Sequence, residues 1–453
     1  MLLFLLSSLM VDSIIYQPGL QHAQIGLIVL DLDKDSVVYA YNHDKLLVPA
    51  SNVKILTSAA ALVFLGPDFR YRTRIAFGGR LRNRRLQGNI MVFGRGDPNF
   101  SLSDVDSFVN AIKNKGISEI EGDIVLVDDY FTEERLPIGW SWHYLDARYA
   151  AEISALSVNR NTVNVAIEGT TLGEKARVVL EPETGYVTLV NNMVTKIGDD
   201  SIIIYRRPDA NVIYVDGGIG YGRARNIEVA VKDPTMYFGE YLKERLRASD
   251  VRVNGKCIRS SGITQIADTA YTIIDSVISI PMFDIIKELN TESVNLFAEA
   301  VLKTLGAYFR RQGSFRAGVS ILKEFMRRCG VDTNFVVLHD GSGLSRYNLM
   351  SPYALALILR RMYHSKYFTD FYNLLPGPGE GTIENRFKDM VGSLRAKTGT
   401  LDAISCLSGY LHIGGRYYCF SLMFNNFACS RKQIESIQED LLKALKVYLE
   451  KEA

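Results

Sequence analysis

The feature that most constrains the fold is a change of residue pattern near residues 69 and 264. Between these positions, short runs such as YRTRIAF, GNIMVFG and SIIIYR alternate with Gly, Asn and Asp turns. Runs rich in β-branched and aromatic residues between such turns are typical of β-strands. Helix-like patterns dominate after this stretch and precede it at 53–66. We therefore predict a β-rich insertion at 69–264 within a discontinuous domain formed by 16–68 and 265–453.

The discontinuous domain has strand-like runs near both of its ends. Residues 25–41 read as two β-rich runs around a turn, and LRAKTGTL, ISCLSGYLHI and RYYCFSLMFNNF follow the helical segments. A final amphipathic pattern, RKQIESIQEDLLKALKVYLEK, indicates a closing helix. Helices that cover an antiparallel sheet are an α+β arrangement. We expect this fold class, with the large β-rich domain inserted into it.

Composition excludes several classes of protein. The chain is 47% hydrophobic and 23% charged, which is ordinary for a folded globular protein. Its formal charge of +2 gives no basic field, so no nucleic acid partner is expected. The 5 cysteines form no C-x-x-C pair, and the 6 histidines have no paired-ligand spacing. We expect neither a metal nor a cofactor.

The N-terminal stretch MLLFLLSSLMVDS is apolar for about ten residues, which is too short to span a bilayer. Residues 1–15 are similar to the hydrophobic region of a secretory signal, although a basic segment and an A-x-A site are missing. We expect export to a periplasmic or other extracytoplasmic location, and no stable membrane span.

The stretch LLVPASNVKILTSAAAL contains an S-x-x-K motif formed by Ser51 and Lys54. The apolar, Ala-rich segment that follows predicts a buried helix, and residues three apart on a helix are neighbours. A second S-x-x-K, Ser320 and Lys323, falls in the middle of the helical pattern FRAGVSILKEFMRR. There the lysine is most simply part of a solvated face. We therefore choose Ser51 and Lys54 as the reactive pair.

Two further motifs accompany this pair. K-T-G occurs once, as Lys397, Thr398 and Gly399, on a β-like run. S-x-N occurs twice, at 157–159 in the β-rich insertion and as Ser293 and Asn295 between two helical segments. A reactive hydroxyl and amide belong on a firm junction between elements. We therefore choose Ser293 and Asn295.

S-x-x-K, S-x-N and K-T-G in this chain order form the signature of the penicillin-recognising serine acyltransferases. The sequence resembles the class C low-molecular-mass penicillin-binding proteins, which are the D-alanyl-D-alanine carboxypeptidases and endopeptidases of peptidase family S13. The likeness covers about residues 25–427 and includes the segments GRGDPNF, GWSWHYLDARYAAEISALSVNRN, HDGSGLSRYNLMSP and GEGTIENRF. The resemblance implies hydrolysis of D-Ala-terminated peptidoglycan stem peptides or D,D-crosslinks.

The residue types suit an acyl transfer. A serine hydroxyl is a poor nucleophile until a base takes its proton. Lys54 is such a base only when it is neutral, and both burial and a second cation lower the pKa of a lysine. We interpret Lys397 as that second cation.

The remaining roles are hypotheses that lean on the resemblance. Ser51 attacks the carbonyl of the penultimate D-alanine, Ser293 relays a proton to the leaving amine, and Asn295 steadies Lys54 and the substrate. Lys397 and Thr398 bind the terminal carboxylate of the substrate, and Gly399 lets the substrate backbone approach closely. Backbone N–H groups of Ser51 and Thr400 form an oxyanion hole. Arg346 contacts an acidic group of the stem peptide. The expected partners are stem peptides and β-lactam antibiotics, which would acylate Ser51. Whether the chain forms a homo-oligomer stays open.

Two alternatives remain at this point. A serine β-lactamase shares the chemistry of Ser51 and Lys54, but no E-x-x-x-N-like deacylation motif stands between S-x-N and K-T-G. A non-catalytic peptidoglycan-binding protein on the same fold would have no chemical need for all three motifs. Labelling with penicillin discriminates among these classes.

Overall fold

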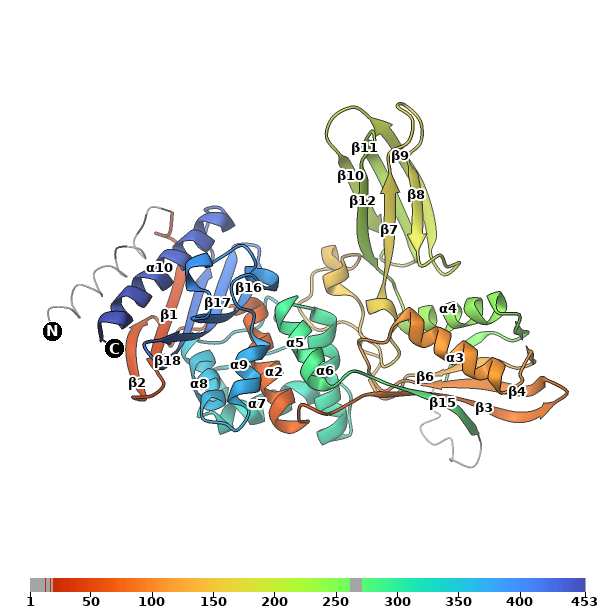
Figure 1. Cartoon of the computed structure of the whole chain (residues 1–453), viewed down its shortest axis with the longest axis horizontal. Coiled ribbons are helices and arrows are strands. Elements are labelled where there is room, and N and C mark those ends of the chain that lie inside the picture. The colour runs from red at the N-terminus through yellow and green to blue at the C-terminus, as the bar shows by residue number, and fades with distance from the viewer. Residues whose placement is uncertain (1–12, 14–16, 18, 261–270, 453) are drawn as a thin grey trace. The chain divides into compact units, whose positions relative to one another are not determined.

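The computed structural model describes residues 13, 17, 19–260 and 271–452, and it divides the chain into two compact units. The first unit contains the described residues of 1–69, 137–140 and 281–453, and the second those of 70–136 and 141–280 (Figure 1). Apart from Ser13, the N-terminal stretch interpreted as an export signal lies outside the described residues. Each unit is described by itself.

A five-stranded antiparallel sheet forms the centre of the first unit, in the order β16-β17-β18-β1-β2. Strands from both ends of the chain pair in it, with Leu27 opposite Leu422. The strands are β1 (Gln24–Asp31), β2 (Ser36–Tyr41), β16 (Leu394–Leu401), β17 (Ile404–Ile413) and β18 (Arg416–Asn425).

Helices cover both faces of this sheet, as Figure 1 shows. Successive side chains of a strand point to opposite faces, so apolar residues at neighbouring positions pack against helices on either side. Leu407 and Leu411 of β17 join an apolar cluster with α10 (Arg431–Glu452). The intervening Tyr410 points the other way, and its hydroxyl donates to the carbonyl oxygen of Leu359 on α8 (Pro352–Tyr363) at 2.8 Å. The predicted α+β fold, with helices over an antiparallel sheet, is confirmed.

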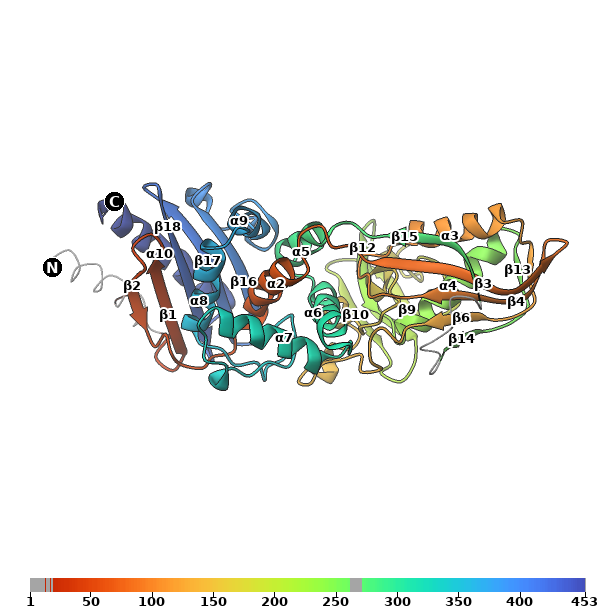
Figure 2. The same cartoon turned by 90° about the horizontal axis from the view of Figure 1, so that it is seen from below.

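Helix α2 (Val53–Phe64) packs against α5, α6, α7 and α8 (Figure 2). The apolar and Ala-rich sequence of α2 fits this position, because ten consecutive residues from Val53 to Leu62 are buried. The bounds are Met282–Thr291 for α5, Asn295–Arg310 for α6 and Phe315–Arg328 for α7, while α9 (Phe368–Leu374) packs against α5 and α8. No helix within the described residues is both long and apolar enough to cross a membrane.

The second unit is rich in β-structure. Its largest sheet has seven strands, namely β3 (Arg72–Arg82), β4 (Arg85–Phe93), β5 (Glu119–Ile120), β6 (Ile124–Val127), β13 (Arg252–Val253), β14 (Cys257–Arg259) and β15 (Thr272–Ile278). Helices α3 (Leu102–Asn114) and α4 (Pro234–Ala248) belong to the same apolar core.

Two three-stranded sheets complete this unit and are drawn in yellow and green in Figure 1. Their strands are β7 (Thr162–Glu168), β8 (Arg177–Glu181), β9 (Thr188–Lys196), β10 (Ser201–Arg206), β11 (Val212–Gly220) and β12 (Ala224–Ala230). Alternate residues such as Val163 and Val165 on β7 and Ile213 and Val215 on β11 are buried in the shared core. This alternation is the pattern that the sequence shows.

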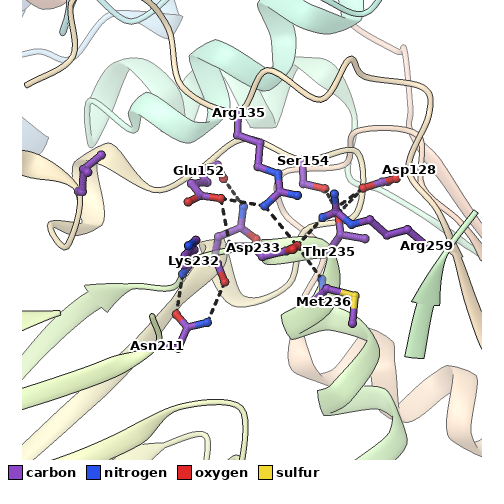
Figure 3. A network of polar contacts seen from close by, with 12 residues as sticks. Asp128, Arg135, Glu152, Ser154, Asn211, Lys232, Asp233, Thr235, Met236 and Arg259 are labelled. Carbon is purple, nitrogen blue, oxygen red and sulfur yellow. Dashed lines mark hydrogen bonds and ion pairs between the residues drawn. The ribbon is translucent and has the colours of Figure 1, made fainter. Parts of the chain in front are cut away.

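A polar network at the N-terminus of α4 connects distant segments of the second unit (Figure 3). Arg135 pairs with Glu152 at 3.1 Å and with Asp233 at 3.3 Å, and Arg259 pairs with the same Asp233. Asp233 is also the N-cap of α4, because its side chain accepts the N–H of Met236 at 3.1 Å. One carboxylate therefore caps a helix and pairs with two guanidinium groups.

Replacement of Asp233 by alanine is expected to destabilise the protein by about 2 kcal/mol, because it removes an N-cap and leaves two partly buried arginines without this partner. Asp209 is the matched control, since it pairs with Arg207 at 2.7 Å while the two side chains are 66% and 50% exposed. Its replacement by alanine should cost at most about 0.5 kcal/mol. Urea unfolding measures both, and equal losses would contradict this account of the network.

Candidate active site

The nucleophile candidate Ser51 lies in a 3-10 turn, η1 (Ala50–Asn52), directly before α2. Ser51 is half-buried, and its hydroxyl oxygen lies 2.9 Å from Nζ of Lys54. The N-cap of α2 is Asn52, whose side chain makes no capping hydrogen bond. The Ser51 hydroxyl is thus directed toward Lys54 rather than toward the backbone of the helix.

Lys54 is fully buried and has three oxygen neighbours. Its Nζ lies 2.9 Å from the hydroxyl of Ser51, 2.6 Å from Oδ1 of Asn295 and 2.8 Å from the carbonyl oxygen of Ser342. The last two atoms can only accept. A neutral amine has two N–H groups and one lone pair, so it donates to these two and presents its lone pair to the Ser51 hydroxyl. The geometry therefore suits a general base.

Electrostatics agree with this arrangement. Burial lowers the pKa of Lys54 from 10.5 to about 7, while the charges of Asp340 and Glu299 act in the opposite direction. The sequence interpretation gave Lys397 a part in this shift. In the structure burial is the cause that lowers the pKa of Lys54, and the repulsion between the two lysines is felt at Lys397, whose pKa is lowered first by burial and then by Lys54.

Ser293 and Lys397 form a second contact beside this base. Ser293 lies between α5 and α6 with a φ of 57°, a left-handed backbone conformation that is strained for a serine. The fully buried Lys397 of β16 donates from Nζ to the Ser293 hydroxyl at 3.0 Å and to the carbonyl oxygen of Thr398 at 2.9 Å. The structure thus brings the S-x-x-K, S-x-N and K-T-G motifs together.

Gly399 allows β16 to approach η1 closely. A Cβ atom at this position would lie 2.7 Å from Nδ2 of Asn52 and 2.9 Å from both the carbonyl oxygen of Pro49 and the backbone nitrogen of Ser51. Thr400, the next residue on the strand, is exposed. The Thr398 hydroxyl donates to that of Thr382 at 2.7 Å. The edge of β16 therefore runs beside the nucleophile, where an extended peptide could bind.

The loop 340–345 contacts both the base and the turn that carries the nucleophile. Asp340 accepts hydrogen bonds from the N–H groups of Gly343 and Ser345, from Nδ2 of Asn348 and from the indole of Trp140, the last at 3.0 Å. Four donors hold this buried carboxylate, which explains why the loop keeps the shape that places the Ser342 carbonyl on Lys54.

Gly343 is required for this loop to pass the nucleophile. Its φ is 85°, and a Cβ atom would lie 1.8 Å from the carbonyl oxygen of Ala50. Gly343→Ala is expected to destabilise the protein by about 3 kcal/mol or more and to displace Ser51. Gly330 is the control, since it has the same φ of 85° and nothing within 4 Å of its Cβ position. Its alanine variant should cost only about 1 kcal/mol. Equal losses of Tm would contradict the close approach.

Other residues singled out in the sequence have hydrogen-bond partners outside this cluster. Arg346 is exposed, and its Nη1 donates to the carbonyl oxygen of Asp402 at 3.1 Å. The alternative S-x-x-K serine, Ser320, donates to the carbonyl oxygen of Ala317 within α7. Ser157 of the alternative S-x-N motif belongs to the second unit, where it donates to the carbonyl oxygen of Ser154.

Sequence reasoning assigned no role to Glu299, Asp340, Ser342 or Thr382. Asp340 and Ser342 belong to HDGSGLSRYN, and Thr382 belongs to GEGTIENRF, both of which we compared with family segments. Glu299 follows Asn295 by one helical turn, a spacing that places both on one helix face. That spacing is the signal by which the sequence could have revealed Glu299.

Comparison with known proteins agrees with this geometry. The model of the D-Ala-D-Ala carboxypeptidase 3 (S13) family matches residues 8–446. The D-alanyl-D-alanine carboxypeptidase of Actinomadura sp. (strain R39) is 30% identical over 432 residues, which cover 92% of this chain and 80% of that protein. The resemblance stated from the sequence is therefore confirmed.

Solved structures show the same fold. Penicillin binding protein 4 from Haemophilus influenzae superimposes with a TM-score of 0.85 at 22% identity, covering 97% of this chain and 99% of that chain. A second structure of that protein, complexed with a β-lactam, gives a TM-score of 0.80 at 22% identity, covering 96% and 99% of the two chains.

Proposed function

The chain belongs to the D-Ala-D-Ala carboxypeptidase 3 (S13) family of serine peptidases, and on that premise we propose that Ser51 is its nucleophile. The substrate is a D-Ala-terminated peptidoglycan stem peptide or a D,D-crosslink. The observation that carries the proposal is the contact at 2.9 Å between the Ser51 hydroxyl and a buried lysine whose two other polar neighbours can only accept.

In the acylation step, the proton of the Ser51 hydroxyl passes to Nζ of Lys54 while the serine oxygen attacks the carbonyl carbon of the penultimate D-alanine. The carbon–nitrogen bond then breaks, and the leaving amine takes a proton through the Ser293 hydroxyl, with Lys54 as its source. Backbone N–H groups of Ser51 and Thr400 stabilise the oxyanion, each contributing about 3–4 kcal/mol to the lowering of the barrier. Water then attacks the ester carbon while Lys54 takes its proton, the bond to the Ser51 oxygen breaks, and Lys54 returns the proton to that oxygen.

On the substrate side, Lys397 and Thr398 bind the terminal carboxylate, and Gly399 lets the peptide lie close to β16. Lys397 is buried, which lowers its pKa and disfavours its charged form. An incoming carboxylate favours the ammonium form, so substrate binding and proton uptake by Lys397 are coupled. Arg346 at the exposed edge contacts an acidic group of the stem peptide.

β-Lactams are substrate mimics for such a site and acylate Ser51. Carboxypeptidase and endopeptidase action share every step up to the acyl-enzyme and differ only in the leaving group. The site of action is extracytoplasmic, where peptidoglycan lies, and the apolar N-terminal sequence supports export.

Labelling with a fluorescent penicillin tests the proposal. Wild type should carry one label, located on the peptide that contains Ser51 by mass spectrometry, and Ser51→Ala should carry none. Digestion of purified cell-wall peptides should release D-alanine or cleave D,D-crosslinks only with wild type. Rapid penicillin turnover without lasting label would favour the β-lactamase alternative. A wild type that never labels would contradict the proposal that the chain is an enzyme with Ser51 as its nucleophile.

A further inference from the structure

A second buried carboxylate lies behind the catalytic lysine. Glu299 is fully buried on α6, one turn after Asn295, whose Oδ1 accepts from Nζ of Lys54. Its carboxylate accepts the N–H of Ser342 at 2.7 Å and the N–H of Gly341 at 3.0 Å. Because α6 also supplies Asn295, a single helix face holds Lys54 both directly and through the loop.

Ser342 connects the carboxylate to the lysine. Its N–H donates to Glu299, and its carbonyl oxygen accepts from Nζ of Lys54 at 2.8 Å. The contacts therefore run without interruption from Glu299 through one backbone residue to Lys54 and on to the Ser51 hydroxyl. A change in the position or charge of Glu299 therefore alters the position or protonation of Lys54, which contacts the nucleophile.

The charged groups around Glu299 are few. Asp340 lies on the loop that carries Ser342, and Lys54 lies on α2. The buried Lys303 lies one turn further along α6, over the ring of Phe315. None of the charged residues of α5 and α7, the helices that also pack on α6, is buried. Lys397, which is buried beside Lys54, is the third lysine of this interior, so its charge balance is set by two carboxylates and three lysines.

Burial and then the charge of Asp340 raise the pKa of Glu299 to about 8, against the effect of its N–H donors. The pKa of Lys54 is about 7. Two groups that titrate in one pH range and attract each other when charged form a coupled pair. The negative form of Glu299 favours the ammonium form of Lys54, which is inactive as a base.

We propose that Glu299 is a positioning residue that holds Lys54 against Ser51 through the Ser342 peptide and whose charge controls the pH at which Lys54 becomes a base. The inference rests on the proposed function of Ser51 and Lys54. It assigns to an interior carboxylate, outside the three motifs, the control of the pH dependence of acylation.

The test is the pH dependence of the rate of penicillin acylation for three variants. Glu299→Gln keeps an acceptor oxygen but loses the charge. The acidic limb of its profile of acylation rate against pH should move to lower pH by about half a unit or more. Glu299→Asp keeps the charge but shortens the reach, so its maximal rate should fall about tenfold or more while the limb does not move to lower pH. Glu324→Gln, whose carboxylate pairs with Arg310 and Arg328 at the surface, should match wild type.

Thermal unfolding verifies that each variant is folded. If Glu299→Gln is folded and the acidic limb stays in place or moves to higher pH, the charge of Glu299 does not control the pH dependence. If Glu299→Asp reacts at the rate of wild type, Glu299 does not position Lys54, and this result holds even if the Gln variant does not fold. These results leave the proposed function standing, because Ser51 is still labelled. A wild type that never labels overturns the proposed function and this inference with it.

Discussion

Replacement of Lys54 by methionine is expected to lower the acylation rate of Ser51 by about 1,000-fold or more, because a positioned general base contributes about 10² to 10⁴ to a rate. Methionine fills the buried space without a lone pair on nitrogen, and the Ser51 hydroxyl then has no acceptor for its proton. Asn295 and the Ser342 carbonyl also lose their donor. Stopped-flow labelling with a fluorescent penicillin measures the rate.

Lys54→Arg separates the base from the cation. A guanidinium stays protonated at every accessible pH, so this variant keeps the charge but should be as slow as the methionine variant. The control is Lys323→Met at the second S-x-x-K motif, where the lysine is half-buried on α7 and should be irrelevant to the rate. An arginine variant with the rate of wild type would show that Lys54 acts as a cation and not as a base.

Replacement of Lys397 by methionine is expected to lower kcat/KM for a peptide with a free C-terminal carboxylate by about 100-fold, because loss of a charged partner at a buried contact costs several kcal/mol. The loss should be much smaller for the same peptide with a C-terminal amide, which presents no anion to the lysine. The substrate pair therefore distinguishes carboxylate binding from a general effect on the site.

The control for Lys397 is Lys366→Met, an exposed lysine of the first unit that stands over the ring of Tyr367. It should leave both substrates unaffected. Equal losses on the free acid and the amide in Lys397→Met would instead indicate that the lysine acts mainly on Ser293, to which it donates at 3.0 Å.

The sequence predicted the parts of the site that depend on local spacing. Ser51 and Lys54 are three residues apart at the start of an apolar helix, so their contact follows from helix geometry. The choice of Ser293 and Asn295 over the pair at 157–159 relied on the placement of motifs between helical segments, and the structure brings the chosen pair to Lys54 and Lys397.

The electrostatic partners could not be predicted in this way. Asp340 and Glu299 influence Lys54 because all three are removed from water in one interior, and burial depends on the packing of the whole unit. Of the two causes that the sequence suggested for the lowered pKa of Lys54, burial is the one found in the structure, and Lys397 is not among the groups that shift it. The sequence shows which charged residues are present, but it does not show which of them are buried in the folded protein.

The fold class followed from the residue patterns because periodicity is a local signal. The pairing of β1 with β18 was foreseen only as strands near both chain ends, and its register of Leu27 opposite Leu422 depends on contacts across almost the whole chain. The division of the β-rich unit into one large sheet and two small ones likewise depends on pairing that periodicity does not encode.

Whether Lys54 is neutral when Ser51 reacts can be measured directly on its amine. In protein labelled with ¹³C at lysine Cε, the Lys54 resonance is identified by its absence in Lys54→Met and followed as the pH changes. We expect a titration midpoint near the value of about 7 that burial imposes on this amine. A midpoint above about 9, close to that of an ordinary lysine, would contradict it, because the amine would then be charged and unable to take the proton of Ser51.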